Sequence, residues 1–280
     1  MFLRAGRVVH PFPSLLVALL TATFCLFAGG DGRLALVVGG AMFALQASIG
    51  ATNDLLDEAH DRRGKPAKPI PAGLVGRRTA GLLAMGGGAL GLLLATLQGA
   101  AVLLIALAGY GLGLLYDVGL KRSPVAWLPF ALALPLVPAF AWVAASGTLP
   151  DRYPLLAGMG LLAGIALALA NGLVDLPEDA ASGSRGIAVT LGRARSLRLA
   201  LVCEAALVLL VGLDLAVAPP GLPAVPAVAA WAVTLAGAAC CLLGIARSAD
   251  QSAPRRETGW EIQALGIGLL AVAWFAGQPA

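Results

Sequence analysis

The stretch LALVVGGAMFALQASIGATNDLLDEAHD, Leu34 to Asp61, is apolar along most of its length and then abruptly acidic. Its last nine residues hold four carboxylates, an asparagine and a histidine. The apolar part is long enough to cross a hydrocarbon core about 30 Å thick. The first feature to explain is therefore a membrane-spanning helix that ends in a dense acidic segment.

The rest of the 280-residue chain resembles the apolar part of this stretch, since 59% of its residues are hydrophobic and only 12% are charged. A soluble domain carries about twice that share of charged residues. The apolar runs are continuous and lack the alternation of a transmembrane barrel. We therefore predict an all-α membrane bundle, a single domain over residues 1–280. It has nine spans, near residues 12–30, 34–53, 79–97, 99–116, 124–146, 154–174, 196–217, 223–246 and 260–277.

The basic residues indicate how the bundle lies in its membrane. Of the 19 lysines and arginines, all but Arg33 and Arg152 fall in the N-terminal segment and in alternate loops, which places those segments in the cytoplasm. We expect a bacterial-type inner membrane with the N-terminus and the acidic segment on the cytoplasmic side. The charge thus reflects topology, and we expect no nucleic-acid partner. The four cysteines show no zinc-ligand spacing.

A second acidic segment, NGLVDLPED (Asn171 to Asp179), echoes the first four spans later. Each segment has an asparagine followed by two aspartates at positions i+4 and i+8, a spacing that places the three on one face of a helix. The echo predicts two quasi-repeated four-helix units plus one helix. Glycine runs such as MGGGALG (Met85 to Gly91) predict close helix packing. The prolines of PFALALPLVP (Pro129 to Pro138) predict a kink in the fifth span.

Stacked carboxylates repel one another, so something must compensate their charge. Mg²⁺ takes oxygen ligands and is usually held by one or two carboxylates plus substrate phosphates. Basic segments follow: RRGKPAKPIPAG contains Lys68, YDVGLKRSP contains Lys121 and Arg122, and SGSRGIAVTLGR follows the second motif. Cations beside bound metal can clamp a polyanion. The alternative is that these acids are merely solvated and the bases serve topology.

These segments resemble a known family. NDLLDEAHDRRGKPAKPIPAG is similar to the NDxxDxxxD signature and basic tail of the UbiA superfamily of intramembrane prenyltransferases. DLPEDAASGSRGIAVTLG resembles the second, DxxxD, motif of that family, and YDVGLKRSP resembles its Y-x-x-x-x-K-R segment. The resemblance covers nearly the whole chain. It implies a Mg²⁺-dependent transferase that moves an isoprenyl group from a polyprenyl diphosphate to an acceptor and releases pyrophosphate.

The resemblance also implies roles for individual residues. The metal-binding and catalytic residues would be Asp57, Asp61, Asp175 and Asp179. The substrate-binding residues would be Asn53, Asp54, Lys68, Lys121, Arg122, Asn171 and Tyr116. On a regular helix, Asp54 would point about 100° away from the stripe that Asn53, Asp57 and Asp61 form. Two positions depart from the family pattern, Lys68 where arginine is usual and Asn171 where some members have an acid.

The acceptor is open at this stage. We expect first an aromatic or quinone-precursor acceptor. Membrane lipid, which surrounds the protein, is a further expected partner. The same ionisation step could serve a glycerol-phosphate or sugar-phosphate, a porphyrin-type ring, or cyclisation of the substrate itself. A cation-coupled transporter is the distant alternative, but its carboxylates would lie near the midplane. Glu204 and Asp214 are acids inside the seventh span with no evident basic partner.

Overall fold

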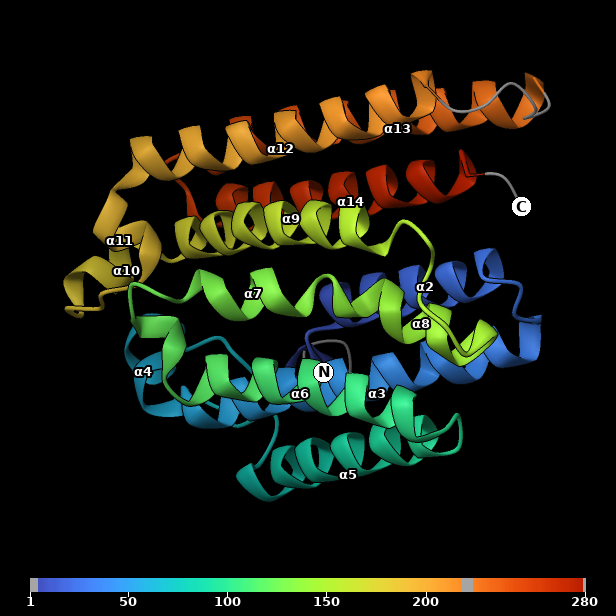
Figure 1. The fold of residues 1–280 in the computed structure, drawn as a ribbon. Coiled ribbons are helices and arrows are strands. Elements are labelled where there is room, and N and C mark those ends of the chain that lie inside the picture. Colours follow the sequence, from blue (N-terminus) through green and yellow to red (C-terminus); the bar gives the residue numbers. More distant parts are fainter. Residues whose placement is uncertain (1–4, 218–223, 279–280) are drawn as a thin grey trace. The chain divides into compact units, whose positions relative to one another are not determined.

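The computed structural model describes residues 5–217 and 224–278, and these are entirely helical with connecting turns (Figure 1). Eight helical segments of the described residues are long and apolar enough to cross a membrane, and one of them, residues 127–146, consists of two consecutive helices. Helix α2 (Pro11–Phe27) is a further apolar helix of 17 residues. The all-helical membrane fold is confirmed, although the count of nine spans is not. Arg4 and the start of the predicted span at residue 223 lie outside the described residues.

The chain forms two compact units, residues 1–121 with 136–151, and residues 122–135 with 152–280. The helices of the first unit are η1 (Gly6–Val9), α2, α3 (Gly32–Leu56), α4 (Glu58–Gly64), α5 (Arg77–Thr96), α6 (Ala100–Val118) and α8 (Leu136–Ser146). Those of the second are α7 (Trp127–Ala133), α9 (Tyr153–Val174), α10 (Leu176–Ala181), α11 (Ile187–Leu191), α12 (Arg193–Ala216), α13 (Ala224–Ser248) and α14 (Ala253–Ala276). The short helix η2 (Leu120–Arg122) ends at the boundary between them.

Each unit thus contains four long helices, namely α2, α3, α5 and α6 in the first and α9, α12, α13 and α14 in the second. The helix left over is the fifth span, which is interrupted at Leu134 and Pro135, so that α7 belongs to the second unit and α8 to the first. Proline has no N–H to donate to the preceding turn, which explains the interruption. The prediction of one undivided domain over residues 1–280 stays a prediction.

Small residues allow the helices of the first unit to approach closely. A Cβ added to Gly91 of α5 would lie 2.9 Å from the carbonyl oxygen of Ala41 in α3, and one added to Gly87 would lie 2.8 Å from that of Ala44. The predicted packing role of the MGGGALG run is therefore confirmed. In the second unit α13 packs along α14, while α9 packs against α7 and α12.

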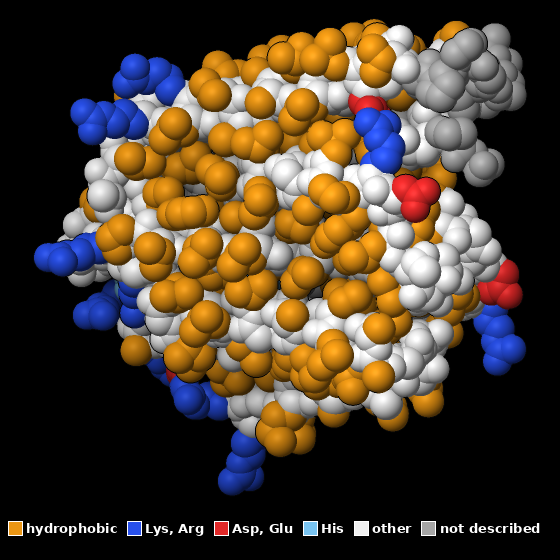
Figure 2. All heavy atoms as spheres, viewed as in Figure 1, with side chains coloured by type: hydrophobic (Ala, Val, Ile, Leu, Met, Phe, Trp, Pro, Cys, Tyr) orange, Lys and Arg blue, Asp and Glu red, His pale blue; other side chains and the backbone are white. Residues whose placement is uncertain are grey.

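The outward-facing side chains of these helices are apolar, as a lipid environment requires. Leu36, Met85 and Leu104 in the first unit are 78%, 76% and 66% exposed, and Leu235 in the second is 67% exposed. Hydrophobic side chains cover most of the surface that Figure 2 shows. A soluble protein rarely exposes contiguous apolar surface on this scale. The protein is therefore an integral membrane protein.

Candidate active site

The first acidic motif lies where the long helix α3 gives way to the short helix α4. Asp31 begins α3 by accepting a hydrogen bond from the backbone N–H of Leu34 at 2.7 Å, a standard N-cap. The helix ends at Leu56, and Asp57 is the joint before α4. Backbone hydrogen bonds from Asp57 to Asn53 and from Asp61 to Asp57 continue across the joint, so the helical register is kept.

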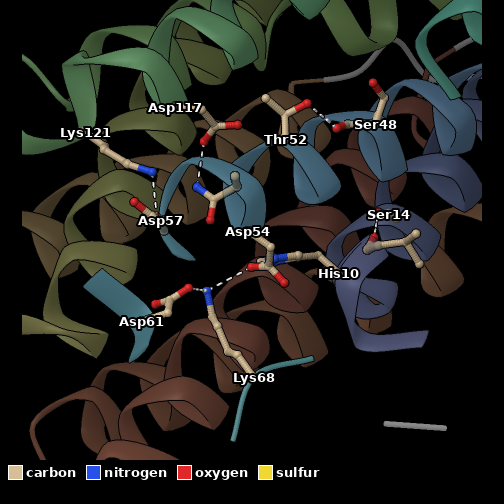
Figure 3. A network of polar contacts seen from close by, with 12 residues as sticks. His10, Ser14, Ser48, Thr52, Asp54, Asp57, Asp61, Lys68, Asp117 and Lys121 are labelled. Atoms are coloured by element: carbon tan, nitrogen blue, oxygen red, sulfur yellow. Dashed lines mark hydrogen bonds and ion pairs between the residues drawn. The ribbon is translucent and has the colours of Figure 1, made fainter. Parts of the chain in front are cut away.

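Lys121 and Asp117, from the end of α6 and the turn after it, meet one side of this motif (Figure 3). The ammonium of Lys121 donates to Oδ2 of Asp57 at 2.6 Å. The Asn53 amide donates from Nδ2 to Oδ1 of Asp117 at 2.7 Å. Both contacts join residues more than 60 positions apart. Sequence analysis gave Asp117 no role, because its partner is visible only after α3 and α6 pack together.

A second lysine, Lys68, meets the other side of the motif (Figure 3). Its ammonium donates to Oδ1 of Asp54 at 2.9 Å and to Oδ2 of Asp61 at 2.8 Å. Burial alone lowers the pKa of Lys68, but the charges and hydrogen bonds of Asp54 and Asp61 outweigh it and hold the pKa above its ordinary range. Lys68 therefore stays charged at any physiological pH.

The loop that carries Lys68 is held in place by a small apolar cluster. Ile70 and Val75 of the loop pack with Val8 of η1 and with Ala80 of α5, and all four are buried. This cluster brings the N-terminal segment next to the motif, where Nε2 of His10 lies 3.1 Å from Oδ1 of Asp54.

The expected stripe of Asn53, Asp57 and Asp61 is divided between the two lysines. Asn53 and Asp57 contact the end of α6 and the turn after it, whereas Asp61 shares Lys68 with Asp54. Asp54 was expected to point away from its neighbours, yet it is 1% exposed and central to the polar network. The separation of about 100° on the helix is real, but Lys68 from the loop after α4 and His10 from the N-terminal segment contact Asp54 on that side.

Two further side chains, Tyr116 and Glu58, lie near the first motif. Tyr116 is half-buried beside Asp117 in the last turn of α6. Glu58 is buried, receives a hydrogen bond from Arg62 at 2.6 Å and forms a second ion pair with Arg77 of α5. Glu58 thus ties α4 to the start of α5.

The second motif, in the second unit, repeats this local design. Helix α9 ends at Val174, Asp175 is the joint, and α10 follows from Leu176. The backbone N–H of Asp179 donates to the carbonyl of Asp175 at 2.9 Å, as Asp61 does to Asp57 in the first motif. The acidic side chains of both aspartates and the amide of Asn171 are half-buried. The matched joints support the interpretation of the two motifs as a repeat.

Basic segments adjoin this motif within the second unit. The backbone N–H of Arg185 donates to the carbonyl of Arg122 at 3.1 Å, which brings Arg122 to the loop after α10. Arg256, in the first turn of α14, is 1% exposed and donates from Nε to the carbonyl of Val174 at 2.9 Å. The sequence gives no sign of this role for Arg256, because the predicted last span begins only at residue 260.

The two acids of the seventh predicted span have different surroundings. Asp214 is paired with Arg152, and Gln278 also donates to it at 2.9 Å, so the expectation that it lacks a basic partner was wrong. Glu204 is 1% exposed, and neither of its carboxylate oxygens has a hydrogen-bond partner among the described residues.

The donors of the first motif suit a magnesium ion that substrate helps to hold. Carboxylate and amide oxygens are hard ligands of the type that Mg²⁺ prefers. No group of three or more acidic, histidine or cysteine side chains is arranged as a complete metal cage in the part of the chain that the structure describes. Mg²⁺ in phosphate-transfer sites needs only one or two carboxylates, with phosphates and water as further ligands.

Each motif by itself has its long helix, aspartate joint, short helix and basic neighbours. Together, fold and motifs define the class: a membrane-embedded helical protein whose spanning helices end in oxygen-rich, cation-lined segments.

Comparison with known proteins assigns the family. The profile of the UbiA prenyltransferase family matches residues 7–274. A digeranylgeranylglyceryl phosphate synthase of Methanopyrus kandleri is 30% identical over 205 residues, which cover 73% of this chain and 75% of that protein. The chain belongs to the UbiA prenyltransferase family, and it is an enzyme of the prenyltransferase type.

Solved structures agree on the fold. A UbiA homologue from Aeropyrum pernix K1 superposes with a TM-score of 0.71 at 20% identity, covering 93% of this chain and 96% of that one. A UbiA homologue from Archaeoglobus fulgidus bound to GPP and Mg²⁺ gives a TM-score of 0.70 at 20% identity, covering 96% and 99%. At this identity the likeness concerns the fold alone.

Proposed function

We propose that this protein transfers an isoprenyl group from an allylic diphosphate to a membrane-soluble acceptor in a Mg²⁺-dependent reaction. The observation that carries the proposal is the repeated aspartate joint, Asp57 and Asp175, each with a second aspartate one turn later. Lys121 pairs with Asp57, and Arg256 binds the carbonyl of Val174 next to Asp175. Family membership and the GPP and Mg²⁺ held by the Archaeoglobus fulgidus homologue support it. Membership of a transferase family also leaves the transporter alternative without support.

The proposed metal-binding residues are Asp57 and Asp61 in the first unit and Asp175 and Asp179 in the second. These carboxylates would hold Mg²⁺, which would supply positive charge to stabilise the leaving diphosphate as the allylic C–O bond breaks. The remaining proposed contacts to the diphosphate come from Lys68, Lys121 and Arg122, with Asn53, Asp54, Asn171 and Tyr116 around it. Fixed cations stabilise a leaving anion best where water is excluded. The two lysines also offset the mutual repulsion of the carboxylates before substrate arrives.

The acceptor that the relatives favour is a glyceryl phosphate rather than an aromatic ring. The Methanopyrus kandleri relative is named digeranylgeranylglyceryl phosphate synthase, which favours a glyceryl phosphate carrying an isoprenoid chain for this protein too. An aromatic or quinone-precursor acceptor remains the competing candidate, and cyclisation without an acceptor is a third outcome of the test below. We place the site at the cytoplasmic face of a bacterial-type inner membrane, with the N-terminus in the cytoplasm, because the basic loops lie on that side.

The test incubates the purified protein with Mg²⁺ and allylic diphosphates of several lengths. A prenylated glyceryl phosphate, a 4-hydroxybenzoate-type aromatic acid, or no acceptor is added. We expect pyrophosphate release with the glyceryl phosphate, and its near loss in Asp57→Asn and Asp175→Asn. Asp151→Asn, an exposed acid at the other end of the first unit, is the matched control. Release that persists in both motif variants would refute the mechanism, and prenylation of the aromatic acid alone would refute the acceptor.

A further inference from the structure

Asp117 has a position that the reaction proposed above leaves unexplained. It lies in the last turn of α6, next to the end of a membrane-spanning segment, and is 4% exposed. One carboxylate oxygen, Oδ1, accepts the hydrogen bond from Asn53 at 2.7 Å. The other, Oδ2, is buried and has no hydrogen-bond partner among the described residues. Burial of a half-satisfied carboxylate is costly, so this arrangement calls for a reason other than stability.

The hydrogen bond decides which way the Asn53 amide points. An ionised carboxylate can only accept hydrogen bonds, whereas the amide has a donor NH₂ at one end and an acceptor oxygen at the other. Asn53 must therefore turn its nitrogen toward Asp117, and its carbonyl oxygen is left on the opposite branch of the planar amide. The terminal torsion of asparagine is broad and nearly two-fold, so nothing within the side chain itself imposes this choice.

The choice matters because the two ends of the amide have opposite effects on a cation. A carbonyl oxygen is a good ligand for a hard cation, while an NH₂ group turned toward the same place would repel it. The same segment also supplies Lys121, which contacts Asp57 one turn further along the motif. The end of α6 and the turn after it thus contact two side chains of the motif, Asn53 and Asp57, at the same time.

We propose that Asp117 is a positioning residue for the acidic motif, which holds the Asn53 carbonyl oxygen ready as a cation ligand. Asp117 acts through Asn53 and does not itself bind the ion, since its free oxygen is buried. The inference rests on the proposed function, because the cation concerned is the metal ion assigned there. Residues that orient metal ligands in this way typically change metal affinity by about 10–100-fold when they are replaced.

The replacement Asp117→Asn separates this role from a structural one. An asparagine at this position can still hydrogen-bond Asn53, in either of two amide orientations, so the link between α3 and α6 is kept. It no longer dictates which end of Asn53 faces the cation. A structural role predicts no change in this variant, whereas a positioning role predicts weaker metal binding at an unchanged thermal midpoint.

The experiment is a double-mutant cycle read by metal binding instead of turnover. Mn²⁺ is titrated into the full-length protein in detergent, and free Mn²⁺ is counted by electron paramagnetic resonance. We expect Asp117→Asn to weaken Mn²⁺ binding about tenfold or more in the wild-type background. In an Asn53→Ala background, where there is no amide to orient, the same replacement should have little effect.

Two results would overturn the inference. Equal losses in both backgrounds would mean that Asp117 acts by its own charge, and no loss in either would mean that it acts only in the fold. If the wild-type protein itself bound no Mn²⁺, the metal-dependent function proposed above would fail together with the inference. If the wild-type protein bound Mn²⁺ and Asp117→Asn left that binding unchanged, the inference alone would fail.

Discussion

Replacement of Lys68 by methionine tests the polar network of the first motif most directly. The side chains of Asp54 and Asp61 are only 2% and 4% exposed, and Lys68 is the cation that both share. Removing one partner of a buried ion pair destabilises a protein by about 3–5 kcal/mol, because the other charge is left uncompensated. Lys68 itself is 23% exposed and His10 still contacts Asp54, so we expect about 3 kcal/mol, the lower end of that range.

The assay is thermal unfolding of the detergent-solubilised protein, first in metal-free buffer. A loss of about 3 kcal/mol corresponds to a midpoint roughly 6–12 °C lower for a large domain. Mg²⁺ should then raise the midpoint of Lys68→Met more than that of the wild type, because a bound cation can replace the missing charge and binding stabilises the folded state. The matched control is Arg78→Met, an exposed cation of the adjacent α5 for which we expect a change within about 0.5 kcal/mol.

The reasoning would be refuted if Lys68→Met unfolded at the wild-type temperature in metal-free buffer. It would also be refuted if Arg78→Met lost as much stability as Lys68→Met, since the effect would then be one of net charge at this end of the unit.

Three further predictions concern the second unit. Arg152→Ala should lower the free energy of unfolding by about 3 kcal/mol, because it leaves the buried Asp214 without its cation. Adding Asp214→Asn should restore part of this loss. An unchanged thermal midpoint in the single variant would contradict the prediction. Gly164→Ala should be strongly destabilising in thermal unfolding, because its Cβ would lie 2.4 Å from backbone atoms of α7. The control Gly158→Ala in the same helix adds a Cβ with no atom within 4 Å and should be neutral or stabilising. Equal effects of the two replacements would rule out close packing as the reason. The backbone N–H of Ser252 and the Arg255 guanidinium lower the pKa of Asp250 to about 2, so the contribution of Asp250 to stability is present above its ordinary pKa and is lost as pH falls toward 2. The difference in stability between the wild type and Asp250→Asn should therefore shrink over that range. A difference that grew on acidification would contradict the sign.

The spanning helices could be predicted from hydropathy to within a few residues, because length and apolar composition alone decide them. The predicted spans 154–174 and 196–217 correspond to Tyr153–Val174 and Arg193–Ala216. The last span was placed seven residues late, since its first turns carry Arg255, Arg256 and Glu257. Hydropathy cannot distinguish a buried arginine that satisfies backbone carbonyls from one that ends a helix.

The site was predictable where the signal is local in the chain. The aspartate spacing and its basic tail identified the first motif, and the structure pairs Asp57 and Asp61 with lysines. The contact of these lysines with a diphosphate stays a prediction. The contacts of Asp117 and His10 with the motif depend on tertiary packing, so no spacing in the sequence could reveal them. The same is true of Arg152 and Asp214, which the sequence places 62 residues apart.

The buried guanidinium of Arg256 has a consequence for how the protein is made. It caps the carbonyl of Val174, immediately before Asp175, and it also donates to the carbonyl of Gln251 at 2.5 Å. Because Arg256 belongs to the last helix, a nascent chain inserts α9 and its acidic motif well before this cap has been synthesised. The second motif acquires its final backbone support only when α14 enters the membrane, and a chain truncated before α14 would carry the motif without that support.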